Sequence, residues 1–115
     1  MAEGSSRDAA ALLPLTPALF HVLLSLADGD KHGYAILKEV ERRTNGEVVL
    51  STGTLYGIIK RLLADGLIRE SVSRSDERRT AYRLTAFGRK VALAEADRLR
   101  TLVEAAEKLL QEPAV

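Results

Sequence analysis

The spacing of the apolar residues changes from a helical period to a strand period at Gly66. Before this glycine, five apolar residues recur at i, i+3, i+4, i+7 and i+8, which predicts one buried helix face: Leu55, Ile58, Ile59, Leu62 and Leu63. After it, residues 67–72 and 80–84 have the composition of two short strands. The charged segment 73–79 joins them. We therefore predict a helix followed at once by a hairpin, and this order constrains the fold more than any other feature.

Three further helices are predicted around this unit. Thr16 followed by Pro17 is typical of a helix start, and Asp28-Gly29-Asp30 ends that helix. A second helix runs from about Gly33 to Arg43, and the third is the helix before Gly66, capped by Ser51 or Thr52. The last helix follows Thr85 and spans 86 to about 111.

The order helix, helix, helix, hairpin, long helix predicts a mainly α fold with a small β-hairpin. We interpret it as a winged helix-turn-helix plus a long C-terminal dimerisation helix. At 115 residues the chain is long enough for one small domain. The predicted parts are a flexible or partner-docking N-terminal segment (1–14), the winged helix-turn-helix domain (15–85), the C-terminal dimerisation helix (86–111) and a tail (112–115).

Composition and motifs exclude several classes of function. The chain has no cysteine and two histidines, which excludes disulfides, thiolate sites and cysteine nucleophiles and leaves little for a metal site. Residues 9–27 are uncharged, but Pro14 and Pro17 interrupt them, so no membrane span is expected. Phosphate-binding loops and HExxH motifs are absent. We expect neither an enzyme nor a cofactor, and a cytoplasmic location.

The net charge of +1 is unevenly distributed. Residues 51–85 contain seven basic and four acidic side chains, a local charge of +3, whereas residues 1–50 sum to −2. The polar face of the third helix is small or basic (Gly53, Thr54, Gly57, Lys60, Arg61, Ala64), with Tyr56 on its flank. Such a face suits the major groove of DNA, and basic groups suit its phosphates. A solvated charged loop remains the alternative interpretation.

Several short blocks occur in a characteristic order: His32-Gly33-Tyr34, Gly53-Thr54-Leu55-Tyr56, Arg61-Leu62, Asp65-Gly66-Leu67-Ile68, Arg78-Arg79, Tyr82-Arg83-Leu84-Thr85 and Gly88. Over about residues 15–90 the chain resembles the PadR family of bacterial transcription regulators. The resemblance implies a winged-helix repressor that acts as a homodimer. It also implies that the third helix reads the major groove, the wing reaches the backbone or minor groove, and the C-terminal helix packs against the partner.

The chain departs from the family pattern at two places. Gly57 stands where the family often has proline, and a helical glycine costs about 1 kcal/mol relative to alanine, so a later or looser helix start is expected. Arg79-Thr80-Ala81-Tyr82 stands where the family commonly has Arg-Lys-Tyr-Tyr, with one base and one aromatic fewer.

With the resemblance, the predicted DNA-binding residues are Ser51, Thr52, Thr54, Tyr56, Lys60, Arg61, Arg74, Arg78 and Arg79. Tyr56 could instead pack on the second helix, and Arg61 could pair with Glu39 or Asp65. We expect Tyr34 in the core and His21 to be partly buried. The alternative function is a protein-interaction winged helix without DNA contact.

A helix of 26 residues spans about 39 Å, more than so small a domain can cover, so a partner is expected on its apolar stripe. The predicted dimerisation residues are Leu12, Leu13, Leu99, Leu102, Val103, Ala106, Leu109 and Leu110. Leu12 and Leu13 would dock on the partner's helix. A small-molecule effector is possible but unidentified, and without tryptophan an aromatic-stacking sensor is not expected.

Overall fold

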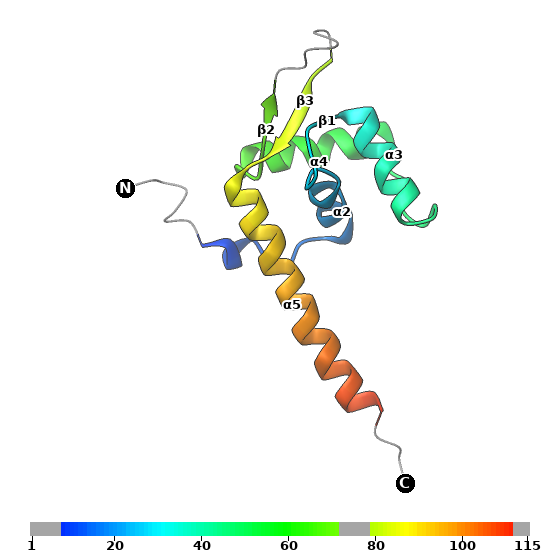
Figure 1. Cartoon of the computed structure of the whole chain (residues 1–115), viewed down its shortest axis with the longest axis vertical. Coiled ribbons are helices and arrows are strands. Elements are labelled where there is room, and N and C mark those ends of the chain that lie inside the picture. The colour runs from blue at the N-terminus through cyan, green and yellow to red at the C-terminus, as the bar shows by residue number, and fades with distance from the viewer. Residues whose placement is uncertain (1–7, 72–78, 112–115) are drawn as a thin grey trace.

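The computed structural model describes residues 8–71 and 79–111 (Figure 1). The elements are η1 (Ala9–Leu12), α2 (Pro17–Ser25), β1 (Lys31–His32), α3 (Gly33–Arg43), α4 (Thr52–Ala64), β2 (Ile68–Ser71), β3 (Ala81–Leu84) and α5 (Ala86–Leu110). Figure 1 shows α2, α3 and α4 gathered beside the small sheet, while the second half of α5 extends away from them. The predicted fold class, a mainly α winged helix-turn-helix with a long C-terminal helix, is confirmed.

Three of the helices are capped at their N-terminus by a residue with a hydroxyl side chain, as predicted. In each case the side-chain oxygen accepts the backbone N–H three residues later: Thr16 from Leu19 (3.2 Å), Ser51 from Thr54 (3.1 Å) and Thr85 from Gly88 (2.9 Å). The predicted late start of α4 is wrong, because the helix begins at Thr52 although Gly57 lies in its second turn. The cap at Ser51 and the burial of Leu55 hold the first turn in place.

The sheet has three antiparallel strands in the order β1-β3-β2. The predicted hairpin is formed by β2 and β3, with Ile68 opposite Leu84 and Glu70 opposite Tyr82. The strand β1 was not predicted, because two residues carry no periodicity; it pairs Lys31 with Tyr82 on the other edge of β3. The sheet therefore joins the start of α3 to the base of the hairpin.

One hydrophobic core receives residues from every helix and from the sheet. On α4 the predicted buried face is confirmed for Leu55, Ile58, Ile59 and Leu62, and Leu63 is partly buried. The other fully enclosed side chains include Val22, Leu23, Leu26, Ile36, Val40, Leu67, Ile68 and Val91. This packing fixes the rotation of α4 about its axis, which decides which of its residues face outwards.

The segment before α2 packs on its own chain. The segment 1–14 was predicted to be flexible or to dock on a partner, and residues 1–7 of it lie outside the described residues. In the rest, η1 lies against α5, and Leu12 and Leu13 pack on the core of their own chain. Glu95 of α5 is 2% exposed and accepts the N–H of Leu15 at 3.4 Å. Both carboxylate oxygens of Glu95 also accept hydrogen bonds from Arg98, at 2.9 and 2.8 Å. Arg98, and then Leu15, hold the pKa of Glu95 below its ordinary value.

The start of α5 is bonded to the turn that follows α4. The Thr85 hydroxyl donates to the carbonyl of Gly66 at 2.7 Å, and the Thr85 N–H donates to that of Leu67 at 3.1 Å. One turn later Gly88 lies directly against the Leu67 carbonyl, so a Cβ there would overlap this backbone oxygen. The helix that precedes the hairpin and the helix that follows it are thereby held together.

We expect Gly88→Ala to lower the free energy of unfolding by about 2 kcal/mol, because the added methyl group must displace backbone. Urea unfolding followed by circular dichroism measures the change. Gly57→Ala is the matched control: Gly57 is exposed and its Cβ would meet nothing within 4 Å. The control should raise stability by up to about 1 kcal/mol, since alanine is the better helix former. An equal shift in both variants would contradict the close contact at Gly88.

The second half of α5 leaves the domain with apolar side chains exposed. The exposed fractions are 55% for Leu102, 51% for Val103, 76% for Leu109 and 82% for Leu110. Leu99 and Ala106, on the same stripe, are partly buried. In the part of the chain that the structure describes, no helix has the length and hydropathy needed to cross a membrane.

Candidate nucleic-acid interface

The outward face of α4 carries the residues that were predicted for it. Seven of them are exposed: Gly53, Thr54, Tyr56, Gly57, Lys60, Arg61 and Ala64. Three are glycine or alanine, so the face is slim and only a few side chains project from it. A helix of this shape can enter a major groove with its polar side chains against the base edges.

The first predicted contact residues of α4 also hold the helix start together. Besides accepting the Thr54 N–H, the Ser51 hydroxyl donates to the Thr54 hydroxyl at 2.9 Å. Ser51, Thr52 and Thr54 are all exposed. Their hydroxyl groups thus lie at the positive end of the helix, where they and the first amide groups can meet an anion.

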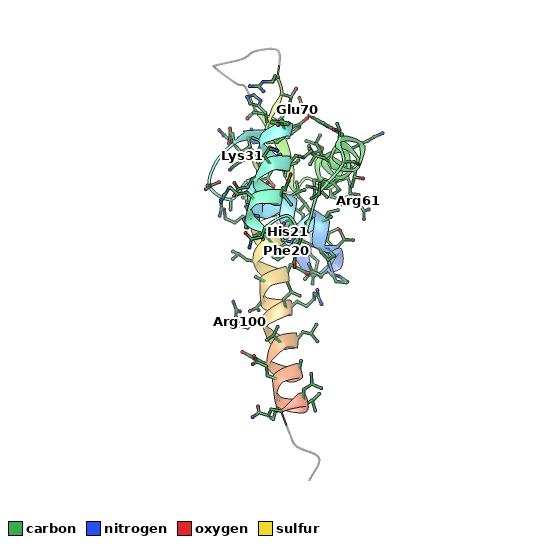
Figure 2. All side chains as sticks on the ribbon, turned by 90° about the vertical axis from the view of Figure 1, so that its right-hand side faces the viewer. Phe20, His21, Lys31, Arg61, Glu70 and Arg100 are labelled. Atoms are coloured by element: carbon green, nitrogen blue, oxygen red, sulfur yellow. The ribbon has the colours of Figure 1, made fainter. Side chains whose placement is uncertain are left out.

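The two basic residues of α4 differ in their partners. Lys60 is exposed and has no ion-pair partner among residues 8–71 and 79–111. Arg61 donates to Asp65 at 3.3 Å, which settles the choice between Asp65 and Glu39, because Glu39 binds Arg42 and Arg43. Figure 2 shows Arg61 on the outer side of α4. Exposed i,i+4 pairs contribute only a few tenths of a kcal/mol, so Arg61 can exchange this partner for a phosphate.

The predicted and neighbouring basic residues of the hairpin differ in what the structure describes of them. Arg74 and Arg78 lie outside the described residues, and Arg79 is exposed just before β3. Arg83 donates twice to Asp30, at 3.1 Å each, and thereby joins β3 to the loop after α2. Arg83 holds the pKa of Asp30 below its ordinary value, and Asp30 raises that of Arg83. No local pattern reveals a pair 53 residues apart.

A hollow of about 300 Å³ lies where α3, α4 and β3 meet, between the outward face of α4 and the base of the hairpin. Its lining consists of one histidine, one glycine, three tyrosines, one arginine and one threonine: His32, Gly33, Tyr34, Tyr56, Arg79, Thr80 and Tyr82. We call it the tyrosine hollow.

One of these tyrosines differs from its prediction, and another matches one of its two interpretations. Tyr34 was expected in the core, but it is 64% exposed, because Gly33, Ile36 and Val40 form the buried face of α3 and Tyr34 lies to the side. Tyr56 is 46% exposed and also packs over Gly33, whose Cβ would overlap the Tyr56 hydroxyl. Tyr56 therefore packs on α3, as one of its two interpretations predicted, and keeps part of its side chain exposed.

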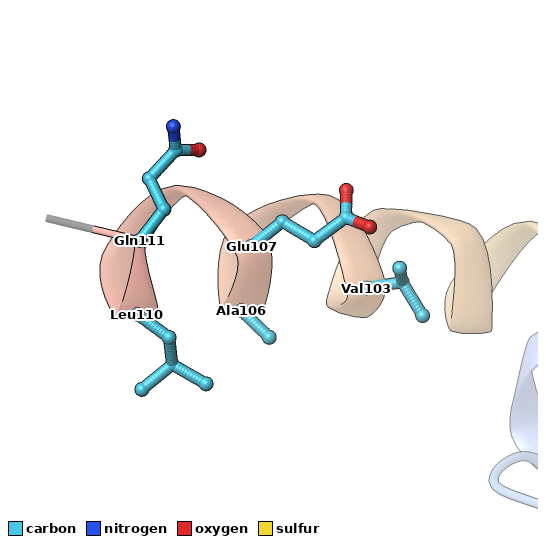
Figure 3. A pocket seen from close by; sticks show the side chains of 5 residues that line it. All are labelled: Val103, Ala106, Glu107, Leu110 and Gln111. Carbon is cyan, nitrogen blue, oxygen red and sulfur yellow. The ribbon is translucent and has the colours of Figure 1, made fainter.

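Three of the predicted dimerisation residues on α5, Val103, Ala106 and Leu110, line an open hollow of about 570 Å³ at the end of that helix. Figure 3 shows Ala106 and Leu110 pointing to one side and Glu107 and Gln111 to the other. All five lining residues, including Val103, come from α5 and its C-cap, so this hollow is an open helix surface and not an enclosed ligand cavity. Leu12 and Leu13 lie apart from it, on the core.

His21 of α2 is partly buried, and its Nδ1 atom is enclosed without a hydrogen-bond partner among the described residues. Figure 2 labels it beside the apolar residue Phe20. Within the described residues, no group of three or more metal-ligating side chains is close enough to hold an ion.

Residues 22–94 match the family model described as "Transcriptional regulator PadR-like family". The chain is 43% identical over 91 residues to transcriptional regulator Rv3488 of Mycobacterium tuberculosis, covering 78% of this chain and 79% of that protein. It is 37% identical over 81 residues to an uncharacterised 37.1 kDa protein in transposon Tn4556 of Streptomyces fradiae, covering 70% of this chain but 22% of that protein. Among solved structures, a PadR family transcription regulator from Clostridium difficile R20291 superposes with a TM-score of 0.68 at 25% identity, covering 80% of this chain and 96% of the other.

Proposed function

This chain belongs to the PadR-like family of transcriptional regulators, and on that premise we propose that it is a cytoplasmic repressor that binds a palindromic DNA site as a homodimer. The family and the matching structure are transcription regulators, which confirms the prediction that the chain is not an enzyme. Repression, the palindrome and the homodimer are the parts of this proposal that experiments must test.

The outward face of α4 carries the proposal. Hydroxyl, phenol and basic groups project from it between three residues with little or no side chain, Gly53, Gly57 and Ala64. The helix has no acidic residue before Asp65. In a helix that enters the major groove, such side chains read base edges, while lysine and arginine meet the flanking phosphates. Lys60 supports this function most directly, because it has no ion pair to give up within the described residues.

The exposed stripe on α5 supports a homodimer. Leu102, Leu109 and Leu110 are more than half exposed on one side of a helix that leaves its own domain. A second copy of the same helix covers this stripe in a two-fold arrangement, the commonest form of assembly. The two α4 helices then reach successive major grooves, with half-site centres about 34–36 Å apart or at a multiple of this distance.

Fluorescence anisotropy with the upstream DNA of the protein's own gene, against a random duplex of equal length, tests the function. Tight and selective binding should weaken steeply with salt. Lys60→Ala should weaken binding to both duplexes alike and reduce the salt slope by about 0.9 per half-site, because one phosphate contact is lost. Lys108→Ala is the matched control: it removes the same charge from the far end of α5 and should leave the slope unchanged.

The alternative function, a protein-interaction winged helix, predicts a different result. Wild-type protein would then bind both duplexes weakly and equally. A genome-wide selection of bound fragments would return no enriched motif. That pair of results would exclude the regulator proposed here.

A further inference from the structure

One row of charged residues crosses the three-stranded sheet at the base of the hairpin. Arg83 of β3 lies opposite Arg69 of β2. On the other edge of β3, Lys31 lies opposite Tyr82, so the preceding residue, Asp30, comes opposite Arg83. Because successive side chains of a strand point to opposite faces, this row lies on the face away from the buried Tyr82 side chain.

The Arg83 guanidinium group binds the Asp30 carboxylate through two of its nitrogens. Nε and Nη2 donate to separate carboxylate oxygens, at 3.1 Å each. A bidentate pair of this kind fixes the relative orientation of two planar groups, which a single contact does not. Asp30 belongs to the loop between α2 and α3, 53 residues before Arg83. The pair therefore ties the hairpin to the segment that leads into α3.

The same pair offsets a repulsion within the hairpin. Arg69 and Arg83 are like charges directly opposite each other, an arrangement that destabilises a sheet. Arg83 most strongly, with a smaller contribution from Arg69, lowers the pKa of Asp30, so the carboxylate stays ionised at neutral pH. Without this carboxylate the two guanidinium groups would repel each other, and β3 would lose its side-chain bond to the loop before β1.

The position of Arg83 decides how far a change at this pair reaches. Arg79, one of the predicted DNA-binding residues, is exposed and lies four residues before Arg83. Four residues span up to about 14 Å, so a rotation of about 10° at Arg83 would move Arg79 by up to about 2 Å. A hydrogen bond to a phosphate oxygen does not survive such a displacement. Few backbone bonds resist this rotation, because β1 pairs with β3 over two residues.

We propose that Asp30 is a positioning residue for DNA binding, which acts through its ion pair with Arg83 to fix the angle between the hairpin and α3. The inference rests on the proposed function, because that angle decides whether the hairpin meets the DNA that α4 has entered. The side chains of Arg83 and Asp30 are 49% and 33% exposed, and a pair this exposed contributes little to stability. Its role is orientation.

Asp30→Asn in the full chain separates this role from the effect of charge. Removing a negative charge near DNA should by itself tighten binding, because phosphates attract a more positive protein. Loss of positioning should instead weaken binding by about fivefold per half-site, the upper range for an exposed ion pair. Fluorescence anisotropy with the upstream duplex measures the affinity.

Asp28→Asn is the matched control. It removes the same charge from the same loop, but Asp28 binds its near neighbour Lys31, at 2.6 Å, and not the hairpin. This variant should bind the duplex at least as tightly as the wild type does.

Reversing the pair tests whether Arg83 acts through Asp30. The double substitution Asp30→Arg, Arg83→Asp keeps the net charge and allows an ion pair of opposite polarity. Asp30→Asn and Arg83→Met should each weaken binding, and the reversed pair should recover most of the loss, the signature of two residues that act through one interaction. A direct contact between Arg83 and a phosphate would not be recovered, because the double variant has aspartate at that position.

The angle can be measured without DNA, because the chain has no cysteine of its own. Spin labels at Ala35→Cys in α3 and Glu70→Cys in β2, both exposed positions, report the distance between these elements. Dilution with unlabelled protein restricts the signal to labels within one chain. The distance distribution should be narrow with the Asp30–Arg83 pair intact, broader or shifted in Asp30→Asn, and narrow again with the reversed pair.

The possible failures are distinguishable. If the wild type binds DNA and Asp30→Asn binds equally or more tightly, the positioning role is excluded and the proposed function stands. A loss in Arg83→Met that the reversed pair does not recover would assign the contact to Arg83 itself and overturn the inference. An unchanged distance distribution in Asp30→Asn would overturn it as well. If the wild type itself binds no duplex, the proposed function fails and the inference fails with it.

Discussion

Replacing Leu109 and Leu110 together by glutamate should convert the dimer into a folded monomer and lower operator affinity by at least about a hundredfold. Both side chains are more than three-quarters exposed, so the domain core does not depend on them. In the dimer they would be covered, and two pairs of carboxylates would be brought together without water. A monomer binds one half-site and loses the gain from linking two binding events.

Light scattering measures the molar mass and anisotropy measures the affinity for the upstream duplex. Thr101→Glu is the control, because Thr101 is exposed on the side of α5 opposite Leu110 and also receives a glutamate. It should stay dimeric. An unchanged dimer in the Leu109→Glu, Leu110→Glu variant would remove this stripe from the subunit interface, and the proposed homodimer would then need another surface.

Replacing Arg98 by methionine should leave the Glu95 carboxylate buried with a single long hydrogen bond from Leu15. Leaving a buried carboxylate without its ion-pair partner lowers the free energy of unfolding by about 3 kcal/mol. The loss is large because the Glu95 side chain is 3% exposed, so water cannot replace the guanidinium group. Urea unfolding at neutral pH measures it.

The same substitution should invert the pH dependence of stability. In the wild type the pKa of Glu95 is lowered by Arg98, so its contribution is present above the unfolded pKa and is lost as pH falls through the folded pKa. Without Arg98, burial raises the folded pKa above the unfolded value. The variant should then lose stability as pH rises through that range, and the deficit should shrink on acidification.

Arg100→Met is the matched control. Arg100 forms the same i,i+3 pair with Asp97, at 2.6 Å, but both side chains are more than 60% exposed. Exposed pairs contribute little, so stability should barely change at any pH. Figure 2 shows Arg100 on the part of α5 that lies outside the domain. Equal losses in the two variants would mean that the burial of Glu95 does not matter.

Local signals explain why much of this fold could be predicted. The second helix was placed at Gly33–Arg43 and found there, and the caps at Thr16, Ser51 and Thr85 depend only on neighbouring residues. The strand β1 has two residues and exists only because β3 is beside it, so no local pattern indicates it. The contact between η1 and α5 likewise joins two segments that are far apart in the sequence, and the spacing of apolar residues within a segment does not reveal it.

The candidate site was predicted in part for the same reason. Periodicity alone gives the outward face of α4. The position of Tyr34 was missed because a tyrosine among apolar neighbours resembles a core residue, whereas the buried face of α3 runs through Gly33, Ile36 and Val40. The tyrosine hollow and the Arg83–Asp30 pair bring together residues from distant segments, so only the folded chain shows them.

Thr85 is hydrogen-bonded to the turn after α4, and Gly88 lies in close contact with the same turn. These contacts make us expect α4 and α5 to move together as one body. In the proposed dimer, a rotation of one α5 helix against the other swings each recognition helix through the same angle. The distance between the two recognition helices is then set by how two long helices cross, far from any base. Substitutions at the distal end of α5 would therefore change the preferred spacing between the two half-sites of the operator without altering any residue that contacts DNA.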